Sequence, residues 1–384
     1  MKDSNQKTIF IVTCTYPNEC GGTDGVFIHN QSIALKDNGA NPVVLFYDFR
    51  SFRKKRKIGI SEYVLDGVKV YRYAFPCGPF PIFLNFLEHI LKNKLYNHVI
   101  KKEGIPDCFH AHFFNAGNIA LMLSKKTGIP FFVTEHSSGI LENNLDKRDI
   151  KKARRVYYEA NCVFPVSFAL AERIKEIAEC NIKVIPNIIP RYFFQESLDK
   201  LKSVNNGTFI FVSVGNFIKR KRFDLLLTAF SLLVKKNSSV FLRLIGSGAL
   251  ETYLKELTKK LGIDSNVFFG SPLKNDEMPS VFSHSDCFVL ASDFETFGMV
   301  YAEAMACGIP VIATKCGGPE SFVTKDNGVL VEKNNPDELS NAMEYIMNNY
   351  YSFSRERIRD FCKKNFSSDI IAIKLINEYQ RITK

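Results

Sequence analysis

One stretch, from Val289 to Phe322, limits what this chain can fold into more than any other. It begins with an apolar run and passes through a loop that contains Glu295. It then continues into an alanine-rich segment that ends at Gly308 and returns to the apolar run Ile309 to Ala313. Short apolar runs on either side of a helix are typical of buried parallel strands. The pattern therefore predicts a strand, a loop, a helix and a strand, as in a doubly wound α/β sheet.

Two carboxylates lie in this stretch, eight positions apart: Glu295 in the predicted loop and Glu303 in the predicted helix. We expect the helix to start near Gly298, where unpaired N–H groups and the positive end of the helix dipole suit a phosphate. Carboxylates instead accept hydrogen bonds from sugar hydroxyls. The combination predicts a ligand that contains both a diphosphate and a sugar.

The N-terminal part of the chain shows a similar order of elements. Thr8 to Thr13 predicts a buried strand, Val26 to Asn38 a helix, and Pro42 to Tyr47 a second strand. Gly22 and Gly25, in the first loop, would let the backbone approach a ligand closely, although a plain turn uses the same residues. The loop does not contain Gly-x-Gly-x-x-Gly, which disfavours a dinucleotide-dependent oxidoreductase.

Histidines occur near the ends of two further predicted strands: His110, His112 and His136. Ligands of α/β sheets bind at the carboxyl ends of the strands. The spacing of the three histidines fits no zinc pattern, so we favour a hydrogen bond from His136 to substrate and a structural role for His110. The ten cysteines include no Cys-x-x-Cys pair, so they indicate neither a zinc site nor a redox motif.

The second half of the chain restarts the pattern. Phe209 to Val214 predicts a strand, and four cationic residues, Lys219 to Arg222, precede a helix predicted from Phe223 to Lys235. Like charges crowded at the start of a helix repel one another unless an anion is present. This loop is therefore interpreted as an anion site.

The charge of the chain is uneven. The net charge is +11, and residues 1–190 carry +8 of it, with 26 Lys and Arg against 18 Asp and Glu. A basic domain indicates an anionic partner. The basic run 50–57 is either a solvated surface or, together with nearby phenylalanines, a site of attraction to an anionic membrane. No nucleic-acid-binding module is evident, so we expect no nucleic-acid partner.

The N-terminus does not resemble a signal peptide, and no run is long and apolar enough to span a bilayer. We therefore expect a cytoplasmic protein that is peripheral at the inner face of the membrane. The length of 384 residues suits two domains, and the polar residues 191–207 are the expected linker.

Several motifs together resemble glycosyltransferase family 4. The stretch that starts at Glu295-Thr296-Phe297-Gly298 and continues through Glu303 to Gly317-Gly318-Pro319-Glu320 resembles the signature of this family. Gly215 to Lys221 resembles its basic glycine segment, Tyr16 to Gly25 its N-terminal glycine loop, and Thr134-Glu135-His136 its central histidine motif. The matches run in the family's order from residue 10 to about residue 335.

The resemblance implies an α/β protein with the GT-B fold, in which two Rossmann-like doubly wound domains face each other across a cleft. Residues 1–190 would bind the acceptor, with a C-terminal helix at about 365–384 packed back on them. Residues 191–364 would bind a nucleotide-sugar donor. The enzymes of the family retain the anomeric configuration of the transferred sugar.

The resemblance also implies roles for single residues. Glu295 would bind hydroxyls of the donor sugar, Arg220 and Lys221 the diphosphate, and His136 the sugar near the reacting carbon. Glu303 would bind the ribose. The complete set is catalytic His136, Arg220, Lys221 and Glu295, and donor-binding Gly22, Gly25, Asn216, Phe297, Gly298, Met299, Val300 and Glu303.

Two positions depart from the family pattern. Asn216 stands where many members have Arg, and Arg222 stands where Gly is usual. Asn cannot neutralise phosphate charge, so Lys219, Arg220 and Lys221 would carry more of that task. The predicted donor site contains no Asp-x-Asp, so we expect no metal and no other cofactor.

The resulting prediction is a retaining glycosyltransferase that moves a sugar from a UDP- or GDP-sugar to a glycan or lipid-linked acceptor. Cell-surface polysaccharide or glycolipid synthesis is the expected setting. The alternatives are a nucleotide-sugar epimerase or phosphorylase on the same fold, and a nucleotide-sugar-binding protein without catalysis. No motif encodes the donor base, the sugar or the acceptor.

Overall fold

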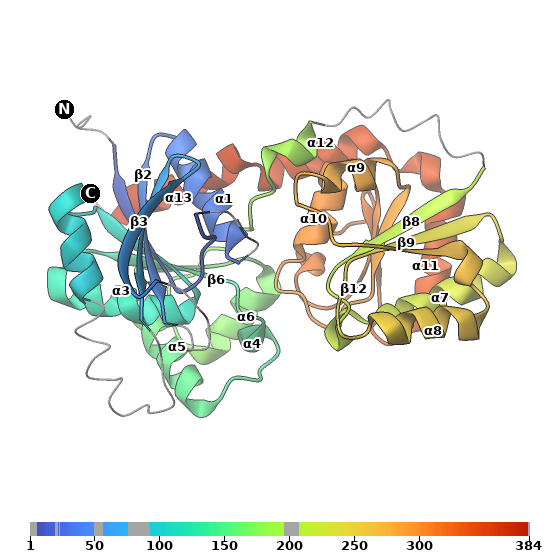
Figure 1. The fold of residues 1–384 in the computed structure, drawn as a ribbon, viewed down its shortest axis with the longest axis horizontal. Coiled ribbons are helices and arrows are strands. Elements are labelled where there is room, and N and C mark those ends of the chain that lie inside the picture. Colours follow the sequence, from blue (N-terminus) through green and yellow to red (C-terminus); the bar gives the residue numbers. More distant parts are fainter. Residues whose placement is uncertain are drawn as a thin grey trace. The chain divides into compact units, whose positions relative to one another are not determined.

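The computed structural model describes residues 6–19, 22, 24–49, 57–75, 93–195 and 207–382, which form two compact units (Figure 1). The first unit consists of Met1–Val166, Leu170–Ile188 and Ser368–Lys384. The second consists of Ser167–Ala169 and Ile189–Ser367. The chain therefore returns to the first unit after it has completed the second.

The first unit is built on a sheet with the strand order β3-β4-β2-β1-β5-β6-β7. Its strands are β1 (Thr8–Thr13), β2 (Asn41–Asp48), β3 (Gly59–Leu65), β4 (Val68–Ala74), β5 (Cys108–His112), β6 (Phe131–Glu135) and β7 (Cys162–Pro165). The helices are α1 (Val26–Asp37), α3 (Phe113–Thr127), α4 (Ser138–Leu141), α5 (Lys147–Glu159), α6 (Phe168–Ile177) and α13 (Ser368–Ile382). Residues 93–103 are also helical. The paired strands are parallel except for β3 and β4.

The second unit is built on a parallel sheet with the order β10-β9-β8-β11-β12-β13. Its strands are β8 (Phe209–Val214), β9 (Val240–Ile245), β10 (Val267–Gly270), β11 (Cys287–Leu290), β12 (Val311–Thr314) and β13 (Gly328–Val331). The α-helices are α7 (Phe223–Lys236), α8 (Glu251–Leu261), α9 (Met278–Ser283), α10 (Met299–Ala306), α11 (Pro336–Asn348) and α12 (Arg355–Phe366). Short 3-10 helices are η1 (Arg191–Phe194), η3 (Lys219–Lys221), η4 (Asp264–Asn266), η5 (Pro319–Ser321) and η6 (Tyr350–Ser352).

Both sheets have the doubly wound order, in which the strand order reverses beside the first strand of the unit. The predicted Rossmann-like α/β architecture is therefore confirmed in each unit. The predicted strands Thr8–Thr13 and Phe209–Val214 have the predicted bounds. Both are almost fully buried, which explains why their sequences are nearly continuous apolar runs.

The hairpin of β3 and β4 was not predicted from the sequence. The residues of β3 are only partly buried or exposed, so they lack the apolar run that identified the other strands. Asp66 and Gly67 join the two strands, and both have positive φ angles, 47° and 75°. Asp-Gly is a strong signal for a two-residue hairpin turn, so this signal was present in the sequence.

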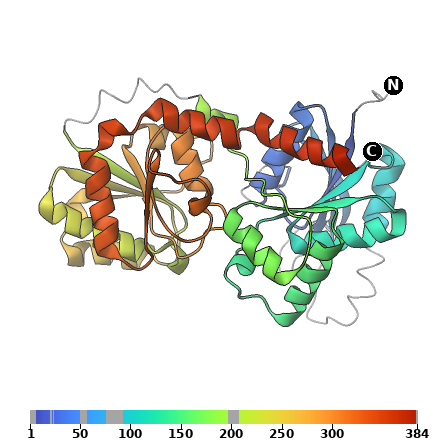
Figure 2. The ribbon, with the colours of Figure 1, turned by 180° about the vertical axis from the view of Figure 1, so that it is seen from behind.

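Helix α13 is part of the core of the first unit, although it is the last described helix of the chain. Ile371, Ala372, Leu375 and Tyr379 are fully or almost fully buried in a cluster that also contains residues of β1, α1 and β2. Figure 2 shows α13 as the last red helix, packed against this unit.

Candidate functional site

Two loops of the second unit leave the sheet at neighbouring strands. One follows β8 and contains η3, and the other follows β11 and contains Glu295. Strands β8 and β11 pair directly, and the strand order reverses between them. The carboxyl ends of strands at such a reversal are the usual ligand site of a doubly wound sheet. The fold therefore brings the predicted cationic loop and the predicted carboxylate together.

An ion pair joins these two loops. Lys221 Nζ lies 2.6 Å from Glu295 Oε1, and the two side chains are only 14% and 10% exposed. Ser292 Oγ donates a second hydrogen bond, of 2.7 Å, to the same oxygen. Within the described part of the chain, no group donates to Glu295 Oε2. The carboxylate is thus fixed through one oxygen and open at the other.

Arg220 ties the same loops together through their backbones. Its guanidinium donates to the carbonyl oxygen of Phe294 at 2.8 Å, and its own carbonyl accepts from the amide of Asp293 at 2.9 Å. Asn216, by contrast, is exposed and its side chain bonds to none of the described residues. The residue after it, Phe217, is buried and donates its amide to Ser247.

The start of helix α10 presents open backbone donors. The amides of Phe297, Gly298, Met299 and Val300 donate to no acceptor among the described residues. Gly298 caps the helix with a φ of 89°, and a Cβ there would lie 2.8 Å from the Tyr301 ring. The buried Phe297 ring packs against Phe322 and holds the loop in place. These donors and the helix dipole suit an anion.

Glu303 lies one helical turn after Met299, so it shares a face of α10 with the start of the helix. Its side chain is half-buried and bonds to none of the described residues. Burial raises the pKa of Glu303 to about 7, because an ionised carboxylate loses hydration there. The carboxyl group therefore changes charge near neutral pH.

Arg222 adopts the left-handed backbone conformation, with φ 49° and ψ 43°, at the N-cap of α7. This conformation is unfavourable for residues with a Cβ, and it explains why glycine is usual at the position. Its guanidinium pairs with Asp224 at 3.2 Å and with Asp293 at 3.3 Å, and it also donates to Asn334. These contacts offset the backbone strain.

In the first unit, Gly25 caps α1 with a φ of 71°, and a Cβ there would lie 2.7 Å from the Thr15 carbonyl oxygen. The Thr15 backbone therefore lies too close to residue 25 for any side chain, so this position requires a glycine. A Cβ on Gly22 would meet nothing within 4 Å among the described residues. Residues 20, 21 and 23 lie outside the described part of the chain, as do 50–56 of the basic run.

His136 follows β6 and lies in a stack of aromatic rings. Its ring is 5.4 Å from that of His112, 4.6 Å from Phe27 and 5.2 Å from Phe113. Its Nε2 and His112 Nδ1 share a hydrogen bond of 3.1 Å, whereas its buried Nδ1 has no partner among the described residues. Burial lowers the pKa of His136 to about 3, so the ring is neutral at neutral pH.

The other members of the histidine cluster are held inside the first unit. His110 is fully buried between the Thr134 hydroxyl, at 2.7 Å, and the Tyr379 hydroxyl, at 2.6 Å. No group of His, Cys, Asp and Glu side chains within the described ranges is arranged to hold a metal ion. His110 thus links the sheet to helix α13.

Comparison with known proteins places the chain. The family model for glycosyl transferases group 1 matches residues 194–365, and the model for glycosyltransferase family 4 matches residues 25–191. A glycosyltransferase of Methanocaldococcus jannaschii, itself uncharacterised, is 31% identical over 260 residues, which are 67% of this chain and 69% of that protein. The chain belongs to glycosyltransferase family 4.

Two further comparisons concern proteins with more informative names. N-acetyl-alpha-D-glucosaminyl L-malate synthase of Bacillus anthracis is 27% identical to this family 4 glycosyltransferase over 296 residues, 74% of this chain and 76% of that one. HepE of Anabaena, solved in complex with UDP, aligns with a TM-score of 0.77 at 19% identity, over 98% of this chain and 100% of HepE. These likenesses confirm the GT-B fold.

Two residues that hold predicted site residues of this glycosyltransferase, one in each unit, were not themselves among the predicted site residues. Ser292 contributes the second hydrogen bond to Glu295. Glu135 is fully buried and accepts hydrogen bonds from the amides of Phe114, His136 and Ser137 and from the Tyr157 hydroxyl. It therefore fixes the backbone at His136. An acidic residue at the end of an apolar strand was the only sequence signal for it.

Proposed function

We propose that this glycosyltransferase is a retaining enzyme that transfers a sugar from a UDP- or GDP-sugar to a glycan or lipid-linked acceptor. The observation that carries the proposal is the Lys221–Glu295 pair, which lies in the loops at the reversal of the strand order. The open amides at the start of α10 begin at Phe297, two residues after Glu295. HepE, which shares the fold, was solved with UDP.

The proposed reaction breaks the bond between sugar C1 and the diphosphate oxygen and forms a bond from C1 to an acceptor oxygen. Negative charge grows on the leaving diphosphate as the first bond breaks. The cations of Arg220 and Lys221 and the amides of residues 297–300 would stabilise that charge more in the transition state than in the ground state. The proton of the acceptor hydroxyl passes to the leaving phosphate, so no protein nucleophile is assigned.

The proposed roles of Glu295, Glu303 and His136 rest on side-chain atoms that have no hydrogen-bond partner among the described residues. Glu295 Oε2 has no donor among the described residues and would accept from a hydroxyl of the donor sugar. Glu303 would accept from the ribose. His136, through its unpartnered Nδ1, would contact the sugar near the reacting carbon. The cations can offset the diphosphate charge, so the proposed mechanism uses neither a metal nor another cofactor.

The acceptor is proposed from charge. Residues 1–190 carry a net charge of +8, which favours an anionic acceptor such as a lipid-linked diphosphate glycan. The Bacillus anthracis relative is named for a malate conjugate, and malate is also an anion. No helix within the described ranges is long and apolar enough to cross a membrane. We place the enzyme in the cytoplasm at the inner face of the membrane, in polysaccharide or glycolipid synthesis.

The first test is turnover of UDP- and GDP-sugars, measured as transfer or slow donor hydrolysis. Lys221→Ala and Glu295→Ala should each reduce the rate at least ~100-fold, because each removes transition-state stabilisation. Lys259→Ala, an exposed change on α8, serves as the matched control and should leave the rate unchanged. Full activity in either site variant would refute the assigned roles.

The alternatives give different products. A requirement for free phosphate would indicate a phosphorylase, and conversion of the donor without an acceptor would indicate an epimerase. Donor binding without turnover over many acceptors would indicate a non-catalytic binding protein. A thermal-shift screen with UDP, GDP, ADP and CMP identifies the base, because a bound ligand raises apparent stability by mass action.

A further inference from the structure

Helix α5, in the first unit, is strongly basic. Its 13 residues include six cations, Lys147, Arg148, Lys151, Lys152, Arg154 and Arg155, and two acids, Asp149 and Glu159. Both acids already have cationic partners, because Asp149 pairs with Lys152 and Glu159 pairs with Lys125 of α3. The other cations of α5 therefore have no acid on their own helix to neutralise them.

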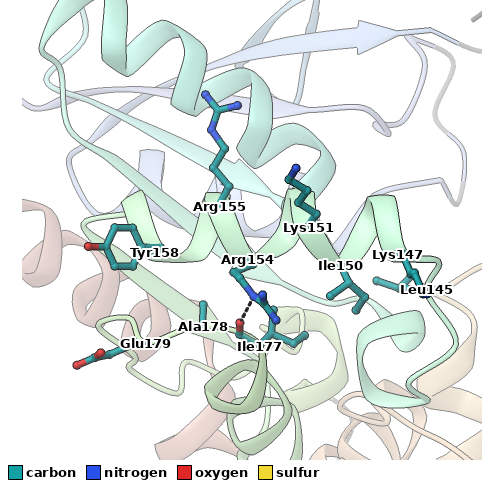
Figure 3. A pocket seen from close by; sticks show the side chains of 10 residues that line it. All are labelled: Leu145, Lys147, Ile150, Lys151, Arg154, Arg155, Tyr158, Ile177, Ala178 and Glu179. Atoms are coloured by element: carbon teal, nitrogen blue, oxygen red, sulfur yellow. Dashed lines mark hydrogen bonds between the residues drawn. The ribbon is translucent and has the colours of Figure 1, made fainter.

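The two faces of α5 differ. Ala153, Val156 and Tyr157 are buried against the unit. Lys147, Lys151, Arg155 and Tyr158 recur at the spacing of one helical turn and are exposed. Figure 3 shows Lys151 and Arg155 projecting from the same side of the helix. Lys147, Lys151 and Arg155 make no ion pair within the described ranges, so this face is a row of uncompensated charge.

A cavity of about 750 Å³ lies between α5 and the end of α6 (Figure 3). Ile150, Ile177 and Ala178 give it an apolar lining, and Leu145 and Tyr158 also contribute. Arg154 turns toward α6 and donates to the carbonyl oxygen of Ile177 at 2.9 Å. Of the lining residues only Glu179 is acidic. The cavity therefore combines an apolar interior with a cationic rim.

The apolar interior and the cationic rim of this cavity together favour a ligand that is both anionic and partly apolar. A soluble phosphate has nothing to place against Ile150 and Ile177, and a neutral apolar molecule gains nothing from the rim. A phospholipid headgroup offers both an anion and methylene groups, and the volume lies in the range of small-molecule sites. Tyr158 is 70% exposed beside the rim, and tyrosine favours the membrane–water interface.

We propose that the face of α5 around this cavity docks the enzyme on a bilayer that contains anionic phospholipid, with one headgroup in the cavity. The inference rests on the proposed function in one respect: a lipid-linked acceptor would give the enzyme a reason to bind a bilayer. It differs from attraction through the basic run 50–57, because it assigns binding to α5 and to a cavity rather than to charge alone.

The test is co-sedimentation of the whole protein with phosphatidylcholine vesicles that contain or lack 30% phosphatidylglycerol, without donor or acceptor. We expect binding only to the anionic vesicles. Each cation near an anionic surface is worth about a fivefold change in partition. Lys151→Gln with Arg155→Gln should therefore weaken binding about 25-fold. Tyr158→Ser should weaken it further, whereas added glycerol phosphate should compete only weakly.

The matched control is Lys259→Gln with Lys260→Gln on α8, which removes the same net charge from another exposed helix. Equal loss in both double variants would mean unspecific charge attraction and would overturn the proposal. Unchanged binding of the α5 variant would also overturn it. So would failure of the wild-type protein to bind anionic vesicles, which would point instead to an acidic protein as the partner of this face. Donor hydrolysis by the variants, measured without vesicles, reports separately on folding and on the proposed function.

Discussion

The proposed role of Glu303 would link ligand binding to pH. Because its pKa is raised to about 7, the ionised form, which we propose accepts hydrogen bonds from a ribose, is a minority at pH 6 and the majority at pH 8. We expect UDP to bind about tenfold more tightly at pH 8 than at pH 6. The terminal phosphate of UDP also titrates in this range. The pH dependence of UDP affinity in Glu303→Gln measures that contribution, which is then subtracted from the wild-type value. Isothermal titration calorimetry at several pH values is the measurement.

The same residue affects stability with a defined sign. Between pH 4.5 and about pH 7 the native Glu303 keeps a proton that the unfolded chain has lost. The native state then binds more protons, so stability falls as pH rises through this window, by about 3 kcal/mol at most. In Glu303→Gln, the free energy of unfolding measured in urea should not show this decrease with rising pH. An identical pH dependence in the two proteins would contradict the assigned burial.

Arg222 offers a test of backbone strain. Both Arg222→Ala and Arg222→Gly remove the contacts with Asp224 and Asp293, but only glycine tolerates the φ of 49°. The alanine variant should therefore be less stable than the glycine variant by ~1 kcal/mol. The difference between their free energies of unfolding, obtained from the midpoint and slope of each urea curve, gives this value. Equal stability of the two variants would show that the native conformation is not left-handed here.

At the scale of elements, α13 stabilises the first unit. The rest of that unit ends at Ile188, so about half the chain lies between it and α13. Leu375 is fully buried in the core cluster. Leu375→Ala should cost ~2–5 kcal/mol through lost burial and a cavity. Hydrogen exchange of the β1 and β5 amides reports the loss in the first unit alone. Asn377→Ala, at an exposed position of α13, should leave exchange unchanged.

The sequence predicted strands that are continuous apolar runs better than strands in which polar residues alternate with apolar ones, as in β3 and β4. The strand Phe209–Val214 was predicted with the correct bounds, whereas β3, with its partly exposed residues, was missed. The sequence also predicted that Lys221 and Glu295 lie in loops that follow strands of the second half of the chain. It did not predict their ion pair, which depends on the pairing of β8 with β11 in the folded sheet. Ser292 and the four hydrogen bonds of Glu135 could not be predicted, since they depend on side-chain positions that only the packed fold defines.

At the scale of the whole molecule, the chain divides its chemistry between two units. The cationic loop, the carboxylates and the open amides of α10 lie in the second unit, and the neutral His136 and the basic helix α5 lie in the first. Burial lowers the pKa values of His110 and His136 to about 3, so these two rings add no charge change near neutral pH. An inflection near pH 7 in the activity profile that disappears in Glu303→Gln would report Glu303.

The return of α13 to the first unit also sets the order in which the protein can mature on the ribosome. Residues up to Ile188 emerge early, but the helix that fills their core begins at Ser368. Translation of the intervening segment takes roughly 10–40 s. During that time the first unit exposes apolar surface that α13 will cover, while the second unit can already fold. The domain that begins the chain is thus the last to be completed, and a truncated product would carry a finished second unit beside an unfinished first one.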